Sequence, residues 1–327
     1  MRVIAGKHRG VVLNEFKGKD IRPTSDRAKE AIFNMLQTEI SGAKCLDLCC
    51  GTGSLGIEAL SRGAQSVTFV DLSKESVEIT KRNLQKVKEN AKVIQSDAIK
   101  FLDSTNEKFD IVFLDPPYAN DVSVKAVEKI MERNLLTNDG FIVFERDCPF
   151  SGAMGASVFK ERKYGKAIVS FIRKQKTALF AGTFDPFTLG HEEVVKQALK
   201  SYDLIHVVIM NNPDKNCLFS LDDRLGIIEA VYKGEGRVKC ACWQGLLVDY
   251  MKDNSSLSNV RGIRNESDLK YEREMEEYNK KLFPEMVYDY VYTDSPISSS
   301  SVRDRLKSGR EVGDLLSRKA LEYLKRK

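Results

Sequence analysis

Two short stretches of this 327-residue sequence combine residue types that can do chemistry. Residues 114–118 (LDPPY) end an apolar run that is typical of a β-strand. Residues 182–186 (GTFDP), followed by Gly190 and His191, open a second strand-to-helix unit. The first stretch suits the binding of an amino group on a base turned out of its helix, and the second suits nucleotide phosphates during transfer. Together they predict two enzymes fused in one chain.

The first stretch predicts a site for a nucleobase amine. Such an amine is a poor nucleophile because its lone pair is delocalised, and hydrogen bonds from it to the Asp115 carboxylate and the Pro116 carbonyl favour a pyramidal nitrogen. Pro116 and Pro117 stiffen the turn, and Tyr118 can stack on the base. We therefore expect these four residues to be catalytic.

A glycine turn upstream predicts the site of the methyl donor. Residues 51–56 fit the spacing GxGxxG, but Asp47 before them would repel a pyrophosphate and suits the cationic methionyl end of S-adenosylmethionine. Asp71, at the end of the next strand, can accept both ribose hydroxyls, and Asp97 can accept from the adenine amino group. Each acid taken alone is also a common loop or cap residue. The expected donor site comprises Asp47, Gly51, Gly53, Asp71 and Asp97.

The second stretch predicts a phosphate site without a nucleophilic residue. Backbone N–H groups at a glycine-rich turn and at a helix N-terminus bind anions. His191 can donate to an α-phosphate as charge builds on it, and Thr183 can hydrogen-bond the attacking phosphate. Residues 297–303 (ISSSSVR) predict a second helix N-terminus for the β- and γ-phosphates.

The elements that must position these residues repeat one pattern twice. Short apolar runs alternate with helical spacing over residues 44–145, a hairpin follows at 158–173, and a new strand begins at Thr177. This predicts the α/β class with two domains, each a Rossmann-like sheet, the first for a methyltransferase and the second for a nucleotidyltransferase. We place the boundary near Gln175, giving domains 1–175 and 176–327.

Charge and cysteine content restrict the partners and the compartment. The net charge is +5, and the first 29 residues carry eight basic side chains against three acidic ones, which suits RNA phosphates or simply a solvated face. Seven cysteines without a CxxC pair indicate a reducing compartment. Since no apolar run is long enough for a membrane span, we expect a cytoplasmic protein without a membrane partner.

The first half resembles amino-methyltransferases with a (D/N)PPY signature. Residues 2–10 (RVIAGKHRG), 21–27 (IRPTSDR) and 30–34 (EAIFN) look like the bacterial 16S rRNA guanine-N2 methyltransferase family of RsmD type. The resemblance implies S-adenosyl-L-methionine as methyl donor and 16S rRNA in a small ribosomal subunit precursor as partner. Two alternatives stay open: an RNA-binding module without methyl transfer, or methylation of DNA adenine or protein glutamine.

The second half resembles the (H/T)xGH nucleotidyltransferases, with Thr188 at the first position of that motif. The motifs that follow it look, in their order, like those of phosphopantetheine adenylyltransferase: residues 219–224 (FSLDDR), 261–264 (RGIR) and 296–303 (PISSSSVR). The resemblance implies attack of the 4′-phosphate of phosphopantetheine on ATP, giving dephospho-CoA and pyrophosphate, with Mg²⁺ on the polyphosphate and a homo-hexamer as the oligomer. It implies that Lys215 is catalytic and that phosphopantetheine is bound by Thr183, Lys215, Leu247 and Arg261. It implies an ATP site made of Thr183, Phe184, His191, Gly262, Ile263, Arg264, Glu272, Asp294, Ser295, Pro296, Ile297, Ser298, Ser299 and Ser300. A cytidylyltransferase or a nicotinate-mononucleotide adenylyltransferase is the alternative.

Overall fold

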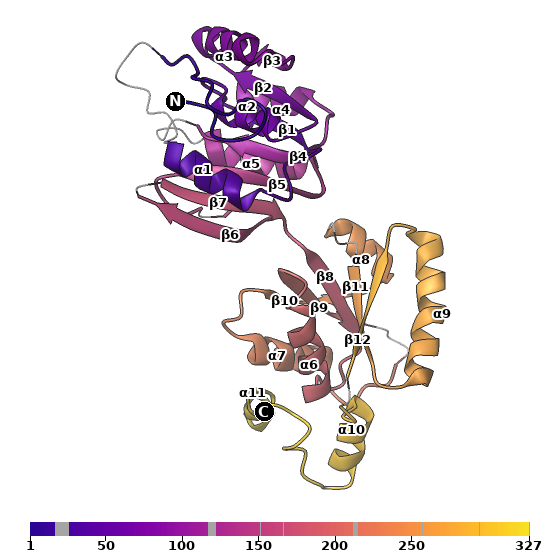
Figure 1. The fold of residues 1–327 in the computed structure, drawn as a ribbon. Coiled ribbons are helices and arrows are strands. Elements are labelled where there is room, and N and C mark those ends of the chain that lie inside the picture. Colours follow the sequence, from indigo (N-terminus) through magenta and orange to yellow (C-terminus); the bar gives the residue numbers. More distant parts are fainter. Residues whose placement is uncertain are drawn as a thin grey trace. The chain divides into compact units, whose positions relative to one another are not determined.

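The structure is a computed structural model that describes residues 1–16, 26–116, 122–150, 152–165, 167–211, 215–254, 256, 258–293 and 295–326, without the side chains of 26–28. The chain divides into two compact units, Met1–Lys174 and Gln175–Lys327. Each unit holds one sheet flanked by helices, which confirms the predicted α/β class (Figure 1). Within the described residues, no helix is long and apolar enough to cross a membrane.

The first unit is built on a seven-stranded sheet in the order β3-β2-β1-β4-β5-β7-β6. Its strands are β1 (Lys44–Leu48), β2 (Ser66–Asp71), β3 (Lys92–Gln95), β4 (Phe109–Leu114), β5 (Leu136–Arg146), β6 (Ala156–Tyr164) and β7 (Ala167–Lys174). Strands β1 to β5 pair in parallel, whereas β7 is antiparallel to both of its neighbours. The carboxyl ends of β1, β2, β3 and β4 therefore meet at one edge of the sheet, where polar residues follow the strands.

Helices cover both faces of this sheet. They are α1 (Asp26–Met35), α2 (Ser54–Ser61), α3 (Lys74–Val87), α4 (Ala98–Ser104) and α5 (Val122–Glu132). Residues of α1, α2 and α3 share one hydrophobic core with one face of the strands, and residues of α4 and α5 share another with the opposite face. The central strands are consequently apolar on both faces, as in β4, where every residue except Asp110 is buried.

The N-terminal segment is fastened to α2 by a buried carboxylate. Glu58 is fully buried and accepts the N–H groups of residues 4 and 5 at 2.7 and 3.0 Å. Lys29 is equally buried and donates to the Arg2 carbonyl at 2.7 Å. Gly6, at φ 80°, lies so close to Ser61 that a Cβ would fall 1.8 Å from the Ser61 carbonyl oxygen. The charge of Lys29 thus serves the fold and is not exposed to a phosphate backbone.

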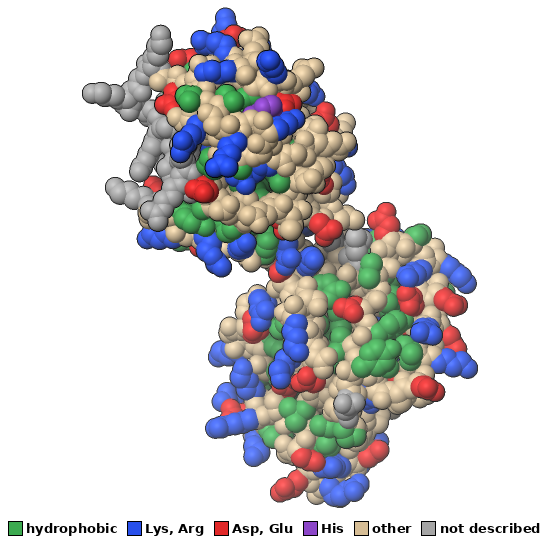
Figure 2. All heavy atoms as spheres, viewed as in Figure 1, with side chains coloured by type: hydrophobic (Ala, Val, Ile, Leu, Met, Phe, Trp, Pro, Cys, Tyr) green, Lys and Arg blue, Asp and Glu red, His purple; other side chains and the backbone are tan. Residues whose placement is uncertain are grey.

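The second unit is built on a five-stranded parallel sheet in the order β10-β9-β8-β11-β12. Its strands are β8 (Thr177–Gly182), β9 (Leu204–Met210), β10 (Val238–Trp243), β11 (Ser258–Ile263) and β12 (Val287–Tyr292). Its helices are α6 (Leu189–Ala198), α7 (Leu221–Tyr232), α8 (Leu247–Asp253), α9 (Glu266–Leu282), α10 (Ser299–Lys307) and α11 (Arg318–Lys325). Residues of α6, α7, α10 and α11 form one core with the sheet, and α8 packs in the other. Figure 2 shows cationic and anionic side chains interspersed over the drawn face of this unit.

Candidate functional sites

The glycine turn of the first unit lies at the carboxyl end of β1. Cys49, Gly51 and Gly53 have left-handed backbone conformations, with φ of 65°, 54° and 74°. The Thr80 hydroxyl on α3 donates to the Gly51 carbonyl at 3.0 Å, which holds the turn from the side. Where Gly56 packs on β2, a Cβ would lie 2.3 Å from the Phe69 ring. The third glycine of the motif is therefore needed for close packing of helix on strand.

Asp47 lies beneath this turn with only 3% of its surface exposed. Its carboxylate accepts the Gly56 N–H at 2.9 Å. Burial raises its pKa to about 8, the Gly56 hydrogen bond opposes that rise, and the charges of Asp115 and Asp71 add to it. An ionised Asp47 consequently favours a cation beside it.

Asp71 and Asp97 follow the next two strands and are both half-buried. Asp71 accepts the backbone N–H groups of Gly51 and Ser73, each at 2.8 Å. Asp97 is the N-cap of α4 and accepts the Lys100 N–H at 3.0 Å. Their carboxylates thus tie loops together, which is the structural role open to each acid alone, and their contacts to ribose and adenine stay predictions.

The four predicted acids of the first unit all act electrostatically on one thiol, that of Cys49. Burial raises the pKa of the Cys49 thiol to about 12, and the charges of Asp71, Asp47, Asp115 and Asp97 contribute to the rise in that order. The four carboxylates therefore lie close enough to one thiol to act on it, at the edge where four parallel strands end. This arrangement concentrates negative potential, which suits a sulfonium donor and not a pyrophosphate.

Only part of the predicted acceptor turn falls within the described residues. Asp115 follows β4 and is half-buried, and Pro116 is buried behind it. Pro117 and Tyr118 lie outside the described residues. Asp115 nevertheless lies close enough to Asp47 to raise its pKa, which puts the acceptor carboxylate beside the donor turn.

The second unit contains a cavity of about 410 Å³ at the carboxyl ends of β8 and β11, facing the N-terminal ends of α6 and α10. Twelve of the predicted residues line it: Thr183, Phe184, His191, Arg261, Gly262, Arg264, Glu272, Ser295, Ile297, Ser298, Ser299 and Ser300. The structure therefore brings together three segments that lie far apart in the sequence, within residues 183–191, 261–272 and 295–300.

His191 enters this cavity from the first turn of α6. Its Nδ1 accepts the Thr188 N–H at 3.0 Å, so that the ring proton is assigned to Nε2. Burial lowers its pKa to about 3, and the positive charges of Arg264 and Arg261 lower it further. The rings of Phe184 and Phe187 pack 5.1 and 5.2 Å from the imidazole. His191 is thus a neutral, rigidly held donor at neutral pH.

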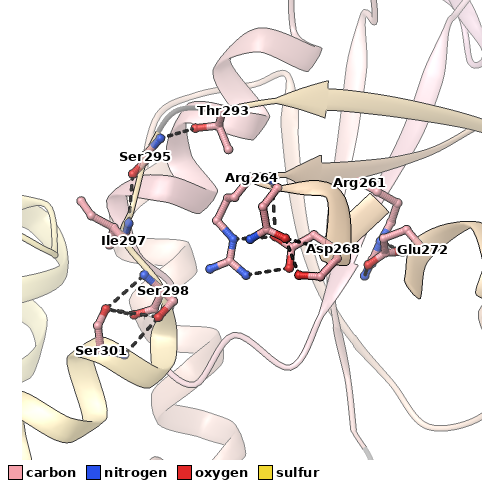
Figure 3. A network of polar contacts seen from close by, with 11 residues as sticks. Arg261, Arg264, Asp268, Glu272, Thr293, Ser295, Ile297, Ser298 and Ser301 are labelled. Atoms are coloured by element: carbon pink, nitrogen blue, oxygen red, sulfur yellow. Dashed lines mark hydrogen bonds and ion pairs between the residues drawn. The ribbon is translucent and has the colours of Figure 1, made fainter. Parts of the chain in front are cut away.

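Two arginines on β11 and just after it are held by carboxylates of α9 (Figure 3). Arg261 donates to both oxygens of Glu272, at 2.7 and 2.5 Å, and Arg264 donates to Asp268 at 2.8 Å. The Glu272 carboxylate, predicted to face ATP, is therefore engaged by Arg261. Both guanidinium groups keep positive charge at the cavity, and the carboxylates fix their direction.

The N-terminus of α10 is closed by a serine capping box (Figure 3). The Ser298 hydroxyl accepts the Ser301 N–H at 3.1 Å, and the Ser301 hydroxyl accepts the Ser298 N–H at 3.1 Å. Ser299 donates to the Pro186 carbonyl at 2.8 Å. Arg303 donates to the Asp185 carbonyl at 2.7 Å. The helix N-terminus is thereby fixed against the motif that precedes α6 and offers the cavity a set of N–H and O–H groups.

Among the described residues, four that were predicted for this site do not line the cavity. Lys215 is exposed, with its Nζ 3.4 Å from the Thr183 hydroxyl, and Pro296 is also exposed. Ile263 is buried, and Leu247 packs in the core that includes α8. Asp294 lies outside the described residues.

Four polar residues of the cavity are absent from the predicted sets: Asp185, Asp268, Tyr271 and Thr293. Arg303 also lines it, at the end of the predicted phosphate segment 297–303. Asp185 accepts the N–H groups of residues 218 and 219, each at 2.9 Å, and so holds the segment that follows Lys215. Helical spacing could have identified Asp268, which lies four residues after Arg264. Within the described residues, no group of three or more acidic, histidine or cysteine side chains is placed to hold a metal ion.

Comparison with known proteins divides the chain into two halves that correspond to the two compact units. A family model described as "Conserved hypothetical protein 95" matches residues 1–173, and one described as "Cytidylyltransferase-like" matches residues 179–305. The ribosomal RNA small subunit methyltransferase D of Haemophilus influenzae is 39% identical over 178 residues, covering 52% of this chain and 91% of that protein. A phosphopantetheine adenylyltransferase of Clostridium botulinum is 37% identical over 155 residues, covering 46% of this chain and 94% of that protein.

Among solved structures, a putative methyltransferase from Escherichia coli is 31% identical, with a TM-score of 0.49, covering 53% of this chain and 97% of that one. The sequence matches over nearly whole relatives confirm the resemblance predicted for each half. The chain belongs to the Conserved hypothetical protein 95 family, that of ribosomal RNA small subunit methyltransferase D, through its first half and to the phosphopantetheine adenylyltransferases through its second, and both are enzyme families.

Proposed function

We propose that this chain is a bifunctional enzyme. Its first unit transfers a methyl group from S-adenosyl-L-methionine to the N2 amine of a guanine in 16S rRNA. Its second unit transfers the adenylyl group of ATP to 4′-phosphopantetheine, giving dephospho-CoA and pyrophosphate. The observation that supports the second activity most directly is the neutral, half-buried His191 in a cavity that meets the N-terminal ends of two helices.

For methyl transfer, the ring of carboxylates around the glycine turn supports a cationic donor held by Asp47, Gly51, Gly53, Asp71 and Asp97. Asp115 then accepts a hydrogen bond from the guanine amine, and the Pro116 carbonyl accepts a second one. The nitrogen forms a bond to the methyl carbon, the electrons of the broken carbon–sulfur bond return to sulfur, and one amine proton leaves. Positioning of the two reactants supplies most of the catalysis.

For adenylyl transfer, Thr183 and Lys215 hold the attacking phosphate of phosphopantetheine. An oxygen of that phosphate forms a bond to the α-phosphorus, and the bond to the leaving pyrophosphate breaks. The Nε2–H of His191 donates to the α-phosphate, where charge builds, while Arg264 and the serine-rich N-terminus of α10 hold the other phosphates. Mg²⁺ would neutralise the polyphosphate, held mainly by its oxygens.

Paired assays of the wild type, Asp115→Ala and His191→Ala test both activities. Methyl transfer is measured with labelled donor and immature small subunits, then with naked DNA. Adenylyl transfer is measured as pyrophosphate release with phosphopantetheine, then with nicotinate mononucleotide. We expect Asp115→Ala to lose only methylation and His191→Ala only adenylyl transfer. A preference for DNA would contradict 16S rRNA as the methyl acceptor. A preference for nicotinate mononucleotide would contradict phosphopantetheine as the adenylyl acceptor.

We extend the proposal to assembly and location. The adenylyltransferase likeness supports a homo-hexamer formed through the second unit in the cytoplasm, where both substrates occur. Light scattering of the full chain tests the oligomer, and a monomer at micromolar concentration would contradict it.

A further inference from the structure

The strand β6 forms one edge of the sheet of the first unit, and a bulge interrupts its pairing with β7. Val158 pairs with Ile172 and Lys160 pairs with Phe171, so that Phe159 between them has no partner in the ladder. The Phe159 ring stays 43% exposed although it touches the rings of Phe141 and Phe171 edge-on. The bulge therefore presents an aromatic ring at the edge of the sheet.

The pairing register adds cations to the same face. Lys160 is opposite Phe171, and its Nζ lies 5.4 Å from the centre of that ring. Arg173, two residues after Phe171 on β7, has its guanidinium carbon 5.3 Å from the centre of the Phe159 ring. Because side chains alternate along a strand, Arg162 lies on this face as well. We call Phe159, Lys160, Arg162 and Arg173 the β6 platform.

Basic side chains are concentrated at this edge of the sheet. Residues 160–174 carry six basic side chains against one acidic one, Glu161, which accepts a hydrogen bond from the Ser170 hydroxyl at 2.7 Å. Lys160 and Arg162 form no ion pair with any carboxylate in the described residues. In the N-terminal segment, by contrast, Lys29 is buried and Lys7 is paired with Glu89 at 2.6 Å. Blue side chains border the part of Figure 2 where Figure 1 draws β6.

Together these features match the way proteins bind unpaired RNA. Bases stack on exposed aromatic rings and on guanidinium planes, while nearby cations bind the backbone phosphates. We propose that the β6 platform binds a single-stranded segment of the RNA substrate next to the methylated base, an inference that rests on the proposed methyltransferase function.

The position of the platform in the sheet suits this role. β6 is three strands away from β4, about 14 Å at the usual spacing of strands, and β6 and β4 run in the same direction. By the pairing register, Arg162 lies level with Asp115 at the same edge of the sheet. Phe159 lies two to three residues further back along β6. A short single-stranded segment can therefore connect the reacting base with the stacked one.

Two sets of variants of the full chain test the proposal. Phe159→Leu keeps apolar contact with Phe141 and Phe171 but removes the aromatic ring, whereas Phe159→Tyr keeps it. The double variant Lys160→Gln/Arg162→Gln removes the two cations. Lys81→Gln/Lys86→Gln is the matched control, because these lysines are exposed on α3, which packs with β2 and β3 at the opposite end of the sheet.

The measurements are the affinity for a single-stranded RNA from the small subunit, its salt dependence, and the kcat and KM of methyl transfer. We expect Phe159→Leu to weaken RNA binding roughly 5- to 150-fold and Phe159→Tyr to retain it. The double variant should lower the slope of log affinity against log salt by about 1.4. Each change should appear in the KM for RNA, with donor affinity and the melting temperature kept.

The outcomes separate this inference from the function on which it rests. Methyl transfer by the wild type with unchanged RNA affinity in both sets of variants overturns the inference alone. An equal loss in the α3 control also overturns it, because nonspecific charge would then explain the binding. A wild type that neither binds nor methylates RNA overturns both the inference and the proposed methyltransferase function.

Discussion

Two side chains, the buried Asp47 of the first unit and the half-buried His191 of the second, have pKa values moved in opposite directions for the same physical reason. Burial disfavours the charged form of any group, so the pKa of the Asp47 carboxyl rises to about 8 while that of the His191 imidazole falls to about 3. At neutral pH Asp47 is therefore mainly in its neutral form before a donor binds, whereas His191 is neutral almost entirely. The consequence for ligand binding differs between them.

For Asp47 we predict donor binding that depends on pH. A cationic donor favours the ionised carboxylate, so its affinity should rise as the pH increases from 6 to 8 and level off above the pKa of about 8. Titration calorimetry in buffers of different ionisation enthalpy should also show a proton released on binding near pH 7. Asp47→Asn should bind more weakly and lose this dependence. A wild-type affinity that is flat from pH 6 to 8.5 would contradict the idea.

For His191 we predict a large loss of adenylyl transfer without a titration in the usual histidine range. Removal of one donor to a charge that builds in the transition state costs roughly 100- to 1,000-fold in kcat, and we expect this of His191→Ala. Because the pKa of about 3 keeps the ring neutral, kcat/KM of the wild type should show no histidine inflection near pH 6.5. His206→Gln is the matched control, since the pKa of His206 is also lowered by burial, but His206 lies on β9, away from the cavity.

At the scale of elements, a single carboxylate connects three segments of the adenylyltransferase site. Asp185 accepts two N–H groups of the segment before α7, and its carbonyl accepts from Arg303 on α10. Its carboxylate also lies 3.6 Å from the Arg303 guanidinium. Asp185 is thus a positioning residue for Lys215 and Arg303.

We predict that Asp185→Ala raises the KM for phosphopantetheine roughly 5- to 150-fold, which corresponds to a cost of about 1 to 3 kcal/mol for partly buried N–H groups left without an acceptor. This rise in KM should exceed the rise in Asp222→Ala, which changes an exposed acidic residue on α7. Steady-state kinetics with melting temperatures for both variants checks this. Equal KM values in the two would show that the segment holds its place without Asp185.

The sequence predicts an element well where local residue patterns form it, and poorly where contacts between residues distant in the sequence form it. β4 and β8 are recognisable because their apolar runs are buried on both faces, and the N-termini of α6 and α10 are recognisable because local spacing sets them. The pairing of Arg261 with Glu272 joins residues eleven apart and depends on how α9 packs on β11. The bulge at Phe159 depends on register, which alternation alone does not determine.

At the scale of the whole molecule, the chain carries two sheets with separate cores, and the two proposed ligand sites lie in different units. A ligand stabilises the folded state to which it binds by an amount set by its concentration and affinity, about 2.7 kcal/mol at one hundred times its dissociation constant. A ligand that binds one unit should therefore stabilise that unit and leave the unfolding of the other unchanged.

We predict two unfolding transitions in the calorimeter with reciprocal responses to ligands. S-adenosyl-L-methionine should raise one melting temperature by a few degrees, and ATP should raise the other, because a unit of this size shifts by about 2 to 4 °C for each 1 kcal/mol of stabilisation. Asp47→Asn should weaken the first shift only, and Arg264→Gln should weaken the second only. A single transition raised by both ligands would mean that the units unfold together, and the independence of the two activities would then have to rest on kinetics alone.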